Sequence, residues 1–145
     1  MENTHQYEVN LHWDSESRGT LSSPALPQQI EVAIPPEFPK GMPGIWSPEH
    51  LFVASVNACL MTTFLVIAEN SKLDFIRFES KAIGTVEKVD RKYRVTKISL
   101  KPVLTIPDTM RKDRAVRILE MSEENCLISN SVNTAIHLQP QVITE

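Results

Sequence analysis

The stretch SPEHLFVASVNACLMTTFLVIAEN, residues 47–70, predicts a long apolar helix at the centre of the fold. Ser47 can cap this helix, Pro48 suits its first position, and Glu49 suits the positive end of its dipole. A helix that continues to about Asn70 is roughly 34 Å long at 1.5 Å per residue. Its apolar composition predicts burial, and one sheet in a chain of 145 residues can cover only one of its sides.

The same stretch approaches the length of a membrane span between Leu51 and Ala68. Polar residues interrupt it at Ser55, Asn57 and Thr62–Thr63. A single span would also leave the amphipathic remainder of the chain unexplained. We therefore favour a buried helix and expect no membrane partner.

Strand patterns flank the predicted helix on both sides. Apolar residues alternate with polar ones before the helix in three segments, residues 7–13, 20–23 and 30–34, and after it in two longer segments, residues 75–89 and 93–106. The strands cluster in hairpins instead of alternating with helices. The expected fold class is therefore α+β with antiparallel sheets.

The remaining segments complete the predicted element order. Residues 35–44 hold four prolines and two glycines, which predicts a loop. Pro107 and Asp108 open a second helix that runs to about Glu123, and the alternating tail predicts a last strand broken by Pro140. The length suits a single domain over residues 1–145.

Composition narrows the possible functions. The net charge of −3 offers no basic surface for nucleic acid, and residues 1–10 carry no secretory signal pattern, so we expect a cytoplasmic protein. Thiols in such a compartment are normally reduced, and any bond between the two cysteines would be transient and catalytic. The four histidines are scattered without ligand spacing, so no metal is assigned.

Cys59, near the middle of the long helix, is the first residue that could carry chemistry. It is either a small buried hydrophobic residue or a nucleophilic thiolate. The amide donors at the helix N-terminus are about 18 Å away, so a thiolate would need a cation from elsewhere. Arg18 is the best candidate, with an exposed turn arginine as the alternative. Glu49 could orient Arg18, or could simply suit the first helical turn.

The stretch from Gly44 to Leu60, GIWSPEHLFVASVNACL, resembles the central signature of the OsmC/Ohr family, the osmotically inducible protein C and organic hydroperoxide resistance proteins. A second resemblance is the segment that begins at Cys126, CLISN, and Arg18 in SRGTL matches the family's arginine. The chain departs from the family pattern at Trp46-Ser47, where Thr-Asn is usual, and at Leu127, where proline is frequent.

This resemblance implies antiparallel sheets wrapped around a long central helix, an intertwined homodimer and a cysteine-based peroxidase in oxidative-stress defence. Cys59 would attack an organic hydroperoxide, or hydrogen peroxide, and become a sulfenic acid that Cys126 resolves as a disulfide. Arg18 and Glu49 would complete the site. A dithiol reductant such as dihydrolipoamide would restore the thiols, and no metal, haem or flavin cofactor is expected.

The spacing of Glu49 and Cys59 adds a geometric expectation. These residues stand ten positions apart, about 15 Å along one helix, so one helix cannot bring both into one pocket. We therefore expect a dimer in which two copies of the helix pack antiparallel and cross near Ala54. The small residues Ser55 and Ala58 would permit close approach.

Two other functions remain open from the residues. A hot-dog-like thioesterase also wraps a sheet around a long helix, although the three strands before the helix speak against it. A non-enzymatic module that binds an apolar ligand between sheet and helix would leave both cysteines inert.

Overall fold

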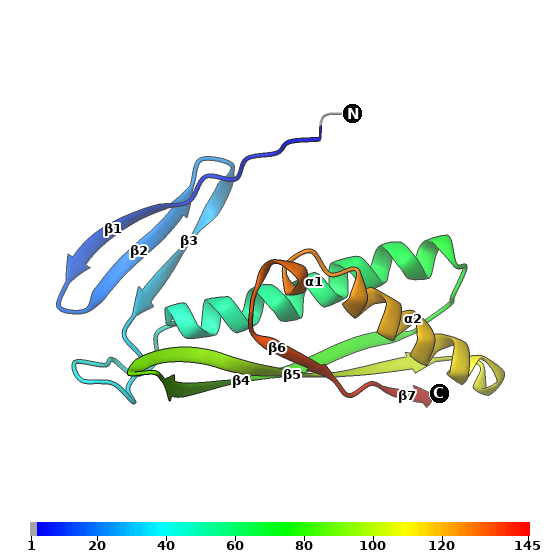
Figure 1. The fold of residues 1–145 in the computed structure, drawn as a ribbon. Coiled ribbons are helices and arrows are strands. Elements are labelled where there is room, and N and C mark those ends of the chain that lie inside the picture. The colour runs from blue at the N-terminus through cyan, green and yellow to red at the C-terminus, as the bar shows by residue number, and fades with distance from the viewer. Residues whose placement is uncertain (1–2) are drawn as a thin grey trace. The chain divides into compact units, whose positions relative to one another are not determined.

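The computed structural model describes residues 3–145, which form two compact units, one up to Leu51 and the other Phe52–Glu145 (Figure 1). The α+β class is confirmed. The single domain over residues 1–145 stays a prediction, and its first two residues lie outside the described part of the chain.

The N-terminal unit is an antiparallel sheet of three strands, β1 (Asn10–Ser15), β2 (Arg18–Ser23) and β3 (Leu26–Ala33), in the order β1-β2-β3. Alternate residues of each strand point to the same face of the sheet, and one of the two faces is apolar. The cross-strand rows of this face are Leu11–Leu21–Ile30 and Trp13–Gly19–Val32. Leu11 is 68% exposed and Trp13 is 69% exposed, so much of this apolar face is open.

Helix α1 (Pro48–Asn70) begins and ends where the sequence predicts. Ser47 is fully buried, and its Oγ accepts a hydrogen bond of 3.1 Å from the His50 amide, as expected of an N-cap. By length and composition alone α1 could cross a membrane, a property that the core helices of soluble proteins share.

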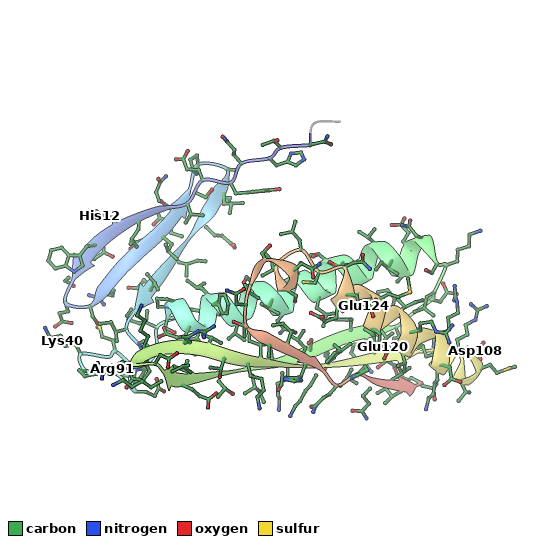
Figure 2. The ribbon with its side chains drawn as sticks, in the orientation of Figure 1. His12, Lys40, Arg91, Asp108, Glu120 and Glu124 are labelled. Atoms are coloured by element: carbon green, nitrogen blue, oxygen red, sulfur yellow. The ribbon has the colours of Figure 1, made fainter. Side chains whose placement is uncertain are left out.

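The C-terminal unit contains a long antiparallel hairpin of β4 (Arg77–Val89) and β5 (Lys92–Ile106). The chain reverses at Asp90 and Arg91, whose φ angles are 50° and 69°, the pair of positive values typical of a tight hairpin turn (Figure 2).

Two short strands, β6 (Ala135–Leu138) and β7 (Gln141–Thr144), also join β5, and both run parallel to it. The expected antiparallel pairing therefore holds for β1–β5, while the tail differs. The physical reason is the connection, because the chain leaves β5 and returns through η1 (Thr109–Arg111), α2 (Lys112–Glu124) and η2 (Ser129–Ser131). A helical crossover of this kind brings the next strand back in the same direction.

The core of this unit lies between the sheet and the two helices (Figure 1). The ring of Phe64 packs against those of Phe75 and Phe78, with centroid separations of 5.1 Å in both cases. The exposed carboxylates Glu120 and Glu124 mark the solvent side of α2 (Figure 2). The buried residues of α1 are Val56, Leu60, Phe64 and Ala68.

The opposite side of α1 is apolar as well, yet it is exposed. Ala58, Met61 and Leu65 follow one another at helical spacing on this open side. A single chain therefore buries one stripe of α1 and leaves a second apolar stripe uncovered, so burial of the helix on all sides is not achieved within one copy.

Candidate functional site

The two thiols of the chain lie side by side in the C-terminal unit. Cys59 stands on the fourth turn of α1 and is partly exposed, while Cys126 follows α2 and is 0% exposed. Both are free, and they lie close enough for each thiol to shift the pKa of the other. The structure thus brings together the two cysteines that the family resemblance paired.

Hydrogen bonds at the end of α2 hold Cys126 in place. Its amide donates to the Glu123 carbonyl at 3.1 Å, and its carbonyl accepts from the Asn130 amide at 3.0 Å. The Asn130 side chain also donates to the carbonyl of Glu124 at 3.1 Å. These contacts fold residues 126–131 into a tight turn that is tied to the helix end.

The same turn supplies hydrogen-bond donors to Cys59. Burial raises the pKa of Cys59, but hydrogen bonds from the Cys126 thiol, the Ile128 amide, the Thr63 hydroxyl and the Leu127 amide together hold this pKa below the usual thiol value. Each of these donors favours the charged sulfur. Cys59 is consequently the thiol that ionises first.

Cys126 has the opposite tendency. Burial and the hydrogen bond that it donates to Cys59 raise its pKa above the usual thiol value, although contacts with Ser129 act in the other direction. A buried thiol with a raised pKa stays protonated while its neighbour is a thiolate. The pair therefore has one sulfur suited to nucleophilic attack, that of Cys59, and one that stays protonated, that of Cys126.

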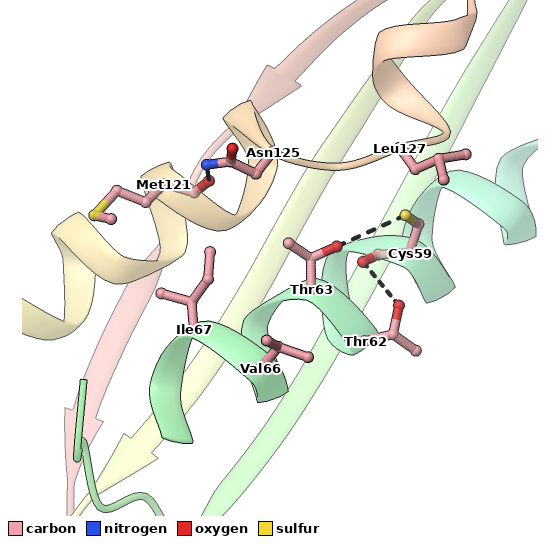
Figure 3. A pocket seen from close by; sticks show the side chains of 8 residues that line it. All are labelled: Cys59, Thr62, Thr63, Val66, Ile67, Met121, Asn125 and Leu127. Carbon is pink, nitrogen blue, oxygen red and sulfur yellow. Dashed lines mark hydrogen bonds between the residues drawn. The ribbon is translucent and has the colours of Figure 1, made fainter. Parts of the chain in front are cut away.

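An open groove of about 650 Å³ borders Cys59 (Figure 3). It lies between α1 and the end of α2, and most of its lining is aliphatic. Because it opens beside the ionisable sulfur, the groove can receive a molecule with an apolar body and a polar reacting end. Its lining residues besides Cys59 are Thr62, Thr63, Val66, Ile67, Met121, Asn125 and Leu127.

Arg18 and Glu49 belong to the N-terminal unit. Arg18 begins β2, where its guanidinium lies 3.8 Å from the Glu31 carboxylate and donates to the Ser15 hydroxyl at 3.1 Å. Glu49 Oε1 is buried and has no hydrogen-bond partner among the described residues. The roles of Arg18 and Glu49, and a pair between them, stay predictions.

The sequence also predicted no metal site. Among residues 3–145, no three or more histidine, cysteine, aspartate or glutamate side chains gather as a metal-binding group. The two thiols and the groove beside Cys59 form a candidate site in the described part of the chain.

Three contributors to this site were not predicted from the sequence: the Thr63 hydroxyl and the amides of Leu127 and Ile128. Thr63 stands four positions after Cys59, a spacing that places both on one helix face and could have identified it. The amides of Leu127 and Ile128 left no such signal, because every residue except proline carries a backbone N–H.

The fold and the site together define a class of α+β protein that has a long central helix and two neighbouring thiols. The sequence profile of OsmC-like proteins matches residues 41–141, so the chain belongs to the OsmC-like protein family. The predicted family resemblance is thereby confirmed. No curated protein matches the chain by sequence.

Solved structures with similar folds support the architecture. An OsmC-like protein of unknown function from Vibrio cholerae superposes with a TM-score of 0.85 at 22% identity, covering 94% of this chain and 99% of the other. An organic hydroperoxide resistance protein from Elizabethkingia anophelis gives a TM-score of 0.75 at 16% identity, with 100% of both chains covered. A protein described in the same way from Legionella pneumophila gives 0.74 at 17% identity, with 98% and 99% covered.

Proposed function

We propose that this protein is a thiol peroxidase that reduces organic hydroperoxides and also accepts hydrogen peroxide. The observation that carries the proposal is the contact between two free thiols with opposite pKa tendencies, Cys59 lowered and Cys126 raised. The family and the hydroperoxide-resistance proteins among its structural neighbours support the same reaction class.

The first half-reaction takes place at Cys59. Its thiolate sulfur attacks the distal oxygen of the hydroperoxide, so that a sulfur–oxygen bond forms while the oxygen–oxygen bond breaks. The two electrons of the new bond come from sulfur, and the alkoxide leaves and takes a proton to become an alcohol. Cys59 is left as a sulfenic acid.

Cys126 completes the oxidative half. Its sulfur attacks Cys59, the sulfur–sulfur bond forms, and the departing hydroxide combines with the Cys126 proton to give water. A disulfide requires Cα atoms within about 7 Å, and the effect that each thiol has on the pKa of the other supports such closeness. A dithiol reductant, of which dihydrolipoamide is an example, then restores both thiols by exchange in a reducing, cytoplasmic setting.

The groove supports an organic substrate in preference to hydrogen peroxide. An alkyl or aryl body would lie against Val66, Ile67, Met121 and Leu127, while the peroxide group reaches Cys59. Removal of apolar surface from water would add to binding of the organic substrate but not of hydrogen peroxide.

A homodimer is the second part of the proposal. The open apolar stripe of α1 and the open apolar face of the β1–β3 sheet each suit a second copy of the chain. If two α1 helices pack antiparallel, Glu49 of one copy stands level with Cys59 of the other, and its unpartnered Oε1 becomes available to orient Arg18 at the site.

The reaction is tested by counting thiols. The reduced protein is treated with cumene hydroperoxide or hydrogen peroxide, free thiols are titrated, and any disulfide is mapped by peptide mass spectrometry. We expect the loss of both thiols of each chain and a Cys59–Cys126 link, faster with cumene hydroperoxide. Unchanged thiols after treatment would end the peroxidase proposal.

The dimer is tested by light scattering coupled to gel filtration. We expect twice the chain mass at micromolar concentration, and Ala58→Glu should shift the protein toward the monomer by placing a charge in the apolar stripe close to the expected helix crossing. Met110→Glu is the matched control, because Met110 is 93% exposed and lies away from that stripe on η1. A monomeric mass for the unaltered protein contradicts this part of the proposal.

The two other functions make different predictions. Acyl-CoA hydrolysis that survives Cys59→Ser would favour a thioesterase. Ordinary thiol reactivity, with no thiol loss on addition of hydroperoxide, would favour a module that binds apolar ligands and uses neither cysteine.

A further inference from the structure

Two neighbouring threonines follow Cys59 on α1, and their hydroxyls have different partners (Figure 3). Thr62 Oγ1 donates to the Cys59 carbonyl at 3.2 Å, the usual local bond of a helical threonine. Thr63 Oγ1 instead lies 3.8 Å from Cys59 Sγ, within hydrogen-bond reach of sulfur. Of these two adjacent hydroxyls, only that of Thr63 contacts the Cys59 sulfur.

The position of Thr63 follows from helix geometry. Residues four apart lie on the same face, so Thr63 and Cys59 border the groove together. The Leu127 and Ile128 amides approach the same sulfur from the turn after Cys126, and neither donates to a backbone carbonyl among the described residues. The Cys59 sulfur therefore has a hydroxyl from its own helix and two amides from the turn as donors.

We propose that Thr63 is a positioning residue, whose hydroxyl holds the Cys59 thiolate in the orientation that faces the turn of residues 126–131. While Cys59 is protonated, either the thiol or the hydroxyl can be the donor. A thiolate has no proton, so the hydroxyl must then donate, and a hydrogen bond to a charged acceptor is stronger than a neutral one. Thr63 thus favours the thiolate over the thiol. Only the naming of Cys59 as the attacking sulfur rests on the proposed peroxidase.

The experiment measures the alkylation of Cys59 in a Cys126→Ser background, where Cys59 is the single thiol left. Iodoacetamide rates are recorded over about pH 5 to 9.5, across the range in which thiols titrate. Thr63→Val keeps the shape of the side chain and removes the hydroxyl. It should slow alkylation at neutral pH about threefold to tenfold and move the rate profile to higher pH, with an unchanged plateau.

Two further variants separate positioning from packing. Thr63→Ser restores a hydroxyl and should return the profile to that of the parent. Thr62→Val removes the neighbouring groove hydroxyl, which donates to the Cys59 carbonyl and not to its sulfur, so the midpoint of its rate profile should stay at the parent's pH. Circular dichroism and a thermal melt establish that each variant is folded before its rates are compared.

A Thr63→Val profile that coincides with the parent's would overturn the inference, as would an equal shift in Thr62→Val. Because alkylation involves no peroxide, this result is independent of the thiol-loss experiment. A chain that shows the Thr63 effect but loses no thiols to hydroperoxide would refute the peroxidase alone.

Discussion

The middle of α1 and the turn after α2 each supply one thiol, and they hold it in different ways. Cys59 projects from a helix whose next residue, Leu60, is fully buried in the core, and it faces an open groove. Cys126 is fully buried, and its turn is tied to α2 by the backbone and side chain of Asn130.

The difference shows how two residues of one type acquire unequal chemistry. The helix presents the Cys59 sulfur to solvent and to donors, while burial keeps the Cys126 thiol protonated. The two regions also meet, because the turn that holds Cys126 donates amides to Cys59. The turn thereby influences both thiols, whereas the helix provides the fixed position.

The largest effect should come from exchanging each thiol for a hydroxyl. Cys59→Ser should lower the consumption of cumene hydroperoxide by at least about a thousandfold, since a serine hydroxyl is a far weaker nucleophile. Cys126→Ser should still consume about one equivalent for each chain and accumulate a sulfenic acid at Cys59 that dimedone labels. Equal loss of the first turnover in both variants would contradict the unequal roles.

The next largest effect should come from the aromatic residues that anchor α1 in the core. Phe64, the residue after Thr63, is fully buried against Phe75 and Phe78. Phe64→Ala should lower the free energy of unfolding by about 3–5 kcal/mol, because a cavity replaces the ring. Urea unfolding followed by circular dichroism measures this loss, with the exposed Met110→Ala as the control that should change it little. A loss near zero would show that α1 is not anchored by its core face.

A smaller effect is expected on the turn. Asn130→Ala removes the side-chain hydrogen bond to the Glu124 carbonyl, which contributes about 1 kcal/mol. The turn should loosen, so that disulfide formation after oxidation of Cys59 slows about fivefold, while the first reaction of Cys59 with hydroperoxide changes less. Stopped-flow kinetics of sulfenic acid decay measures the slower step. A rate of decay equal to that of the unaltered protein would exclude Asn130 as an anchor.

The helix side was the more predictable of the two regions. Ser47, Pro48 and Glu49 are local signals, and they predicted the start of α1 correctly because capping depends on adjacent residues. Pairing Cys59 with Cys126 came from the family resemblance, and the structure places the thiols in contact. Neither the spacing of the two cysteines nor the periodicity of the sequence predicts that contact.

The turn side was less predictable for a physical reason. The parallel pairing of β6 and β7 depends on the path of the crossover, whereas alternation in sequence reports only which side chains share a face. The amides of Leu127 and Ile128 act through backbone groups, which no residue type signals. The expected cation Arg18 has Glu31 and Ser15 as its partners in the described chain, so its role at the site stays a prediction.

The smallest expected effect is on the pH dependence of stability, and it should have opposite signs for the two thiols. The folded-state pKa of Cys59 is lowered. Its contribution to stability therefore grows as pH rises from the lowered pKa to the usual thiol value of about 8.5, and it disappears as pH falls through the lowered pKa. The pKa of Cys126 is raised, so its contribution is complete below about pH 8.5 and is lost as pH rises through the raised value.

Variants with one thiol separate these contributions, with the Cys59→Ser/Cys126→Ser double variant as the reference at each pH. Relative to it, Cys126→Ser should gain stability as pH approaches about 8.5 and then level off, because Cys59 is the one thiol left and the serine hydroxyl can take over as a donor to its sulfur. Cys59→Ser should hold level to about pH 8.5 and then lose stability, because burial, the largest cause of the raised pKa, remains. Urea midpoints at a series of pH values measure both slopes. Slopes of the same sign would mean that the pKa values of Cys59 and Cys126 are shifted in the same direction. The division of roles between the two thiols would then lose its physical basis.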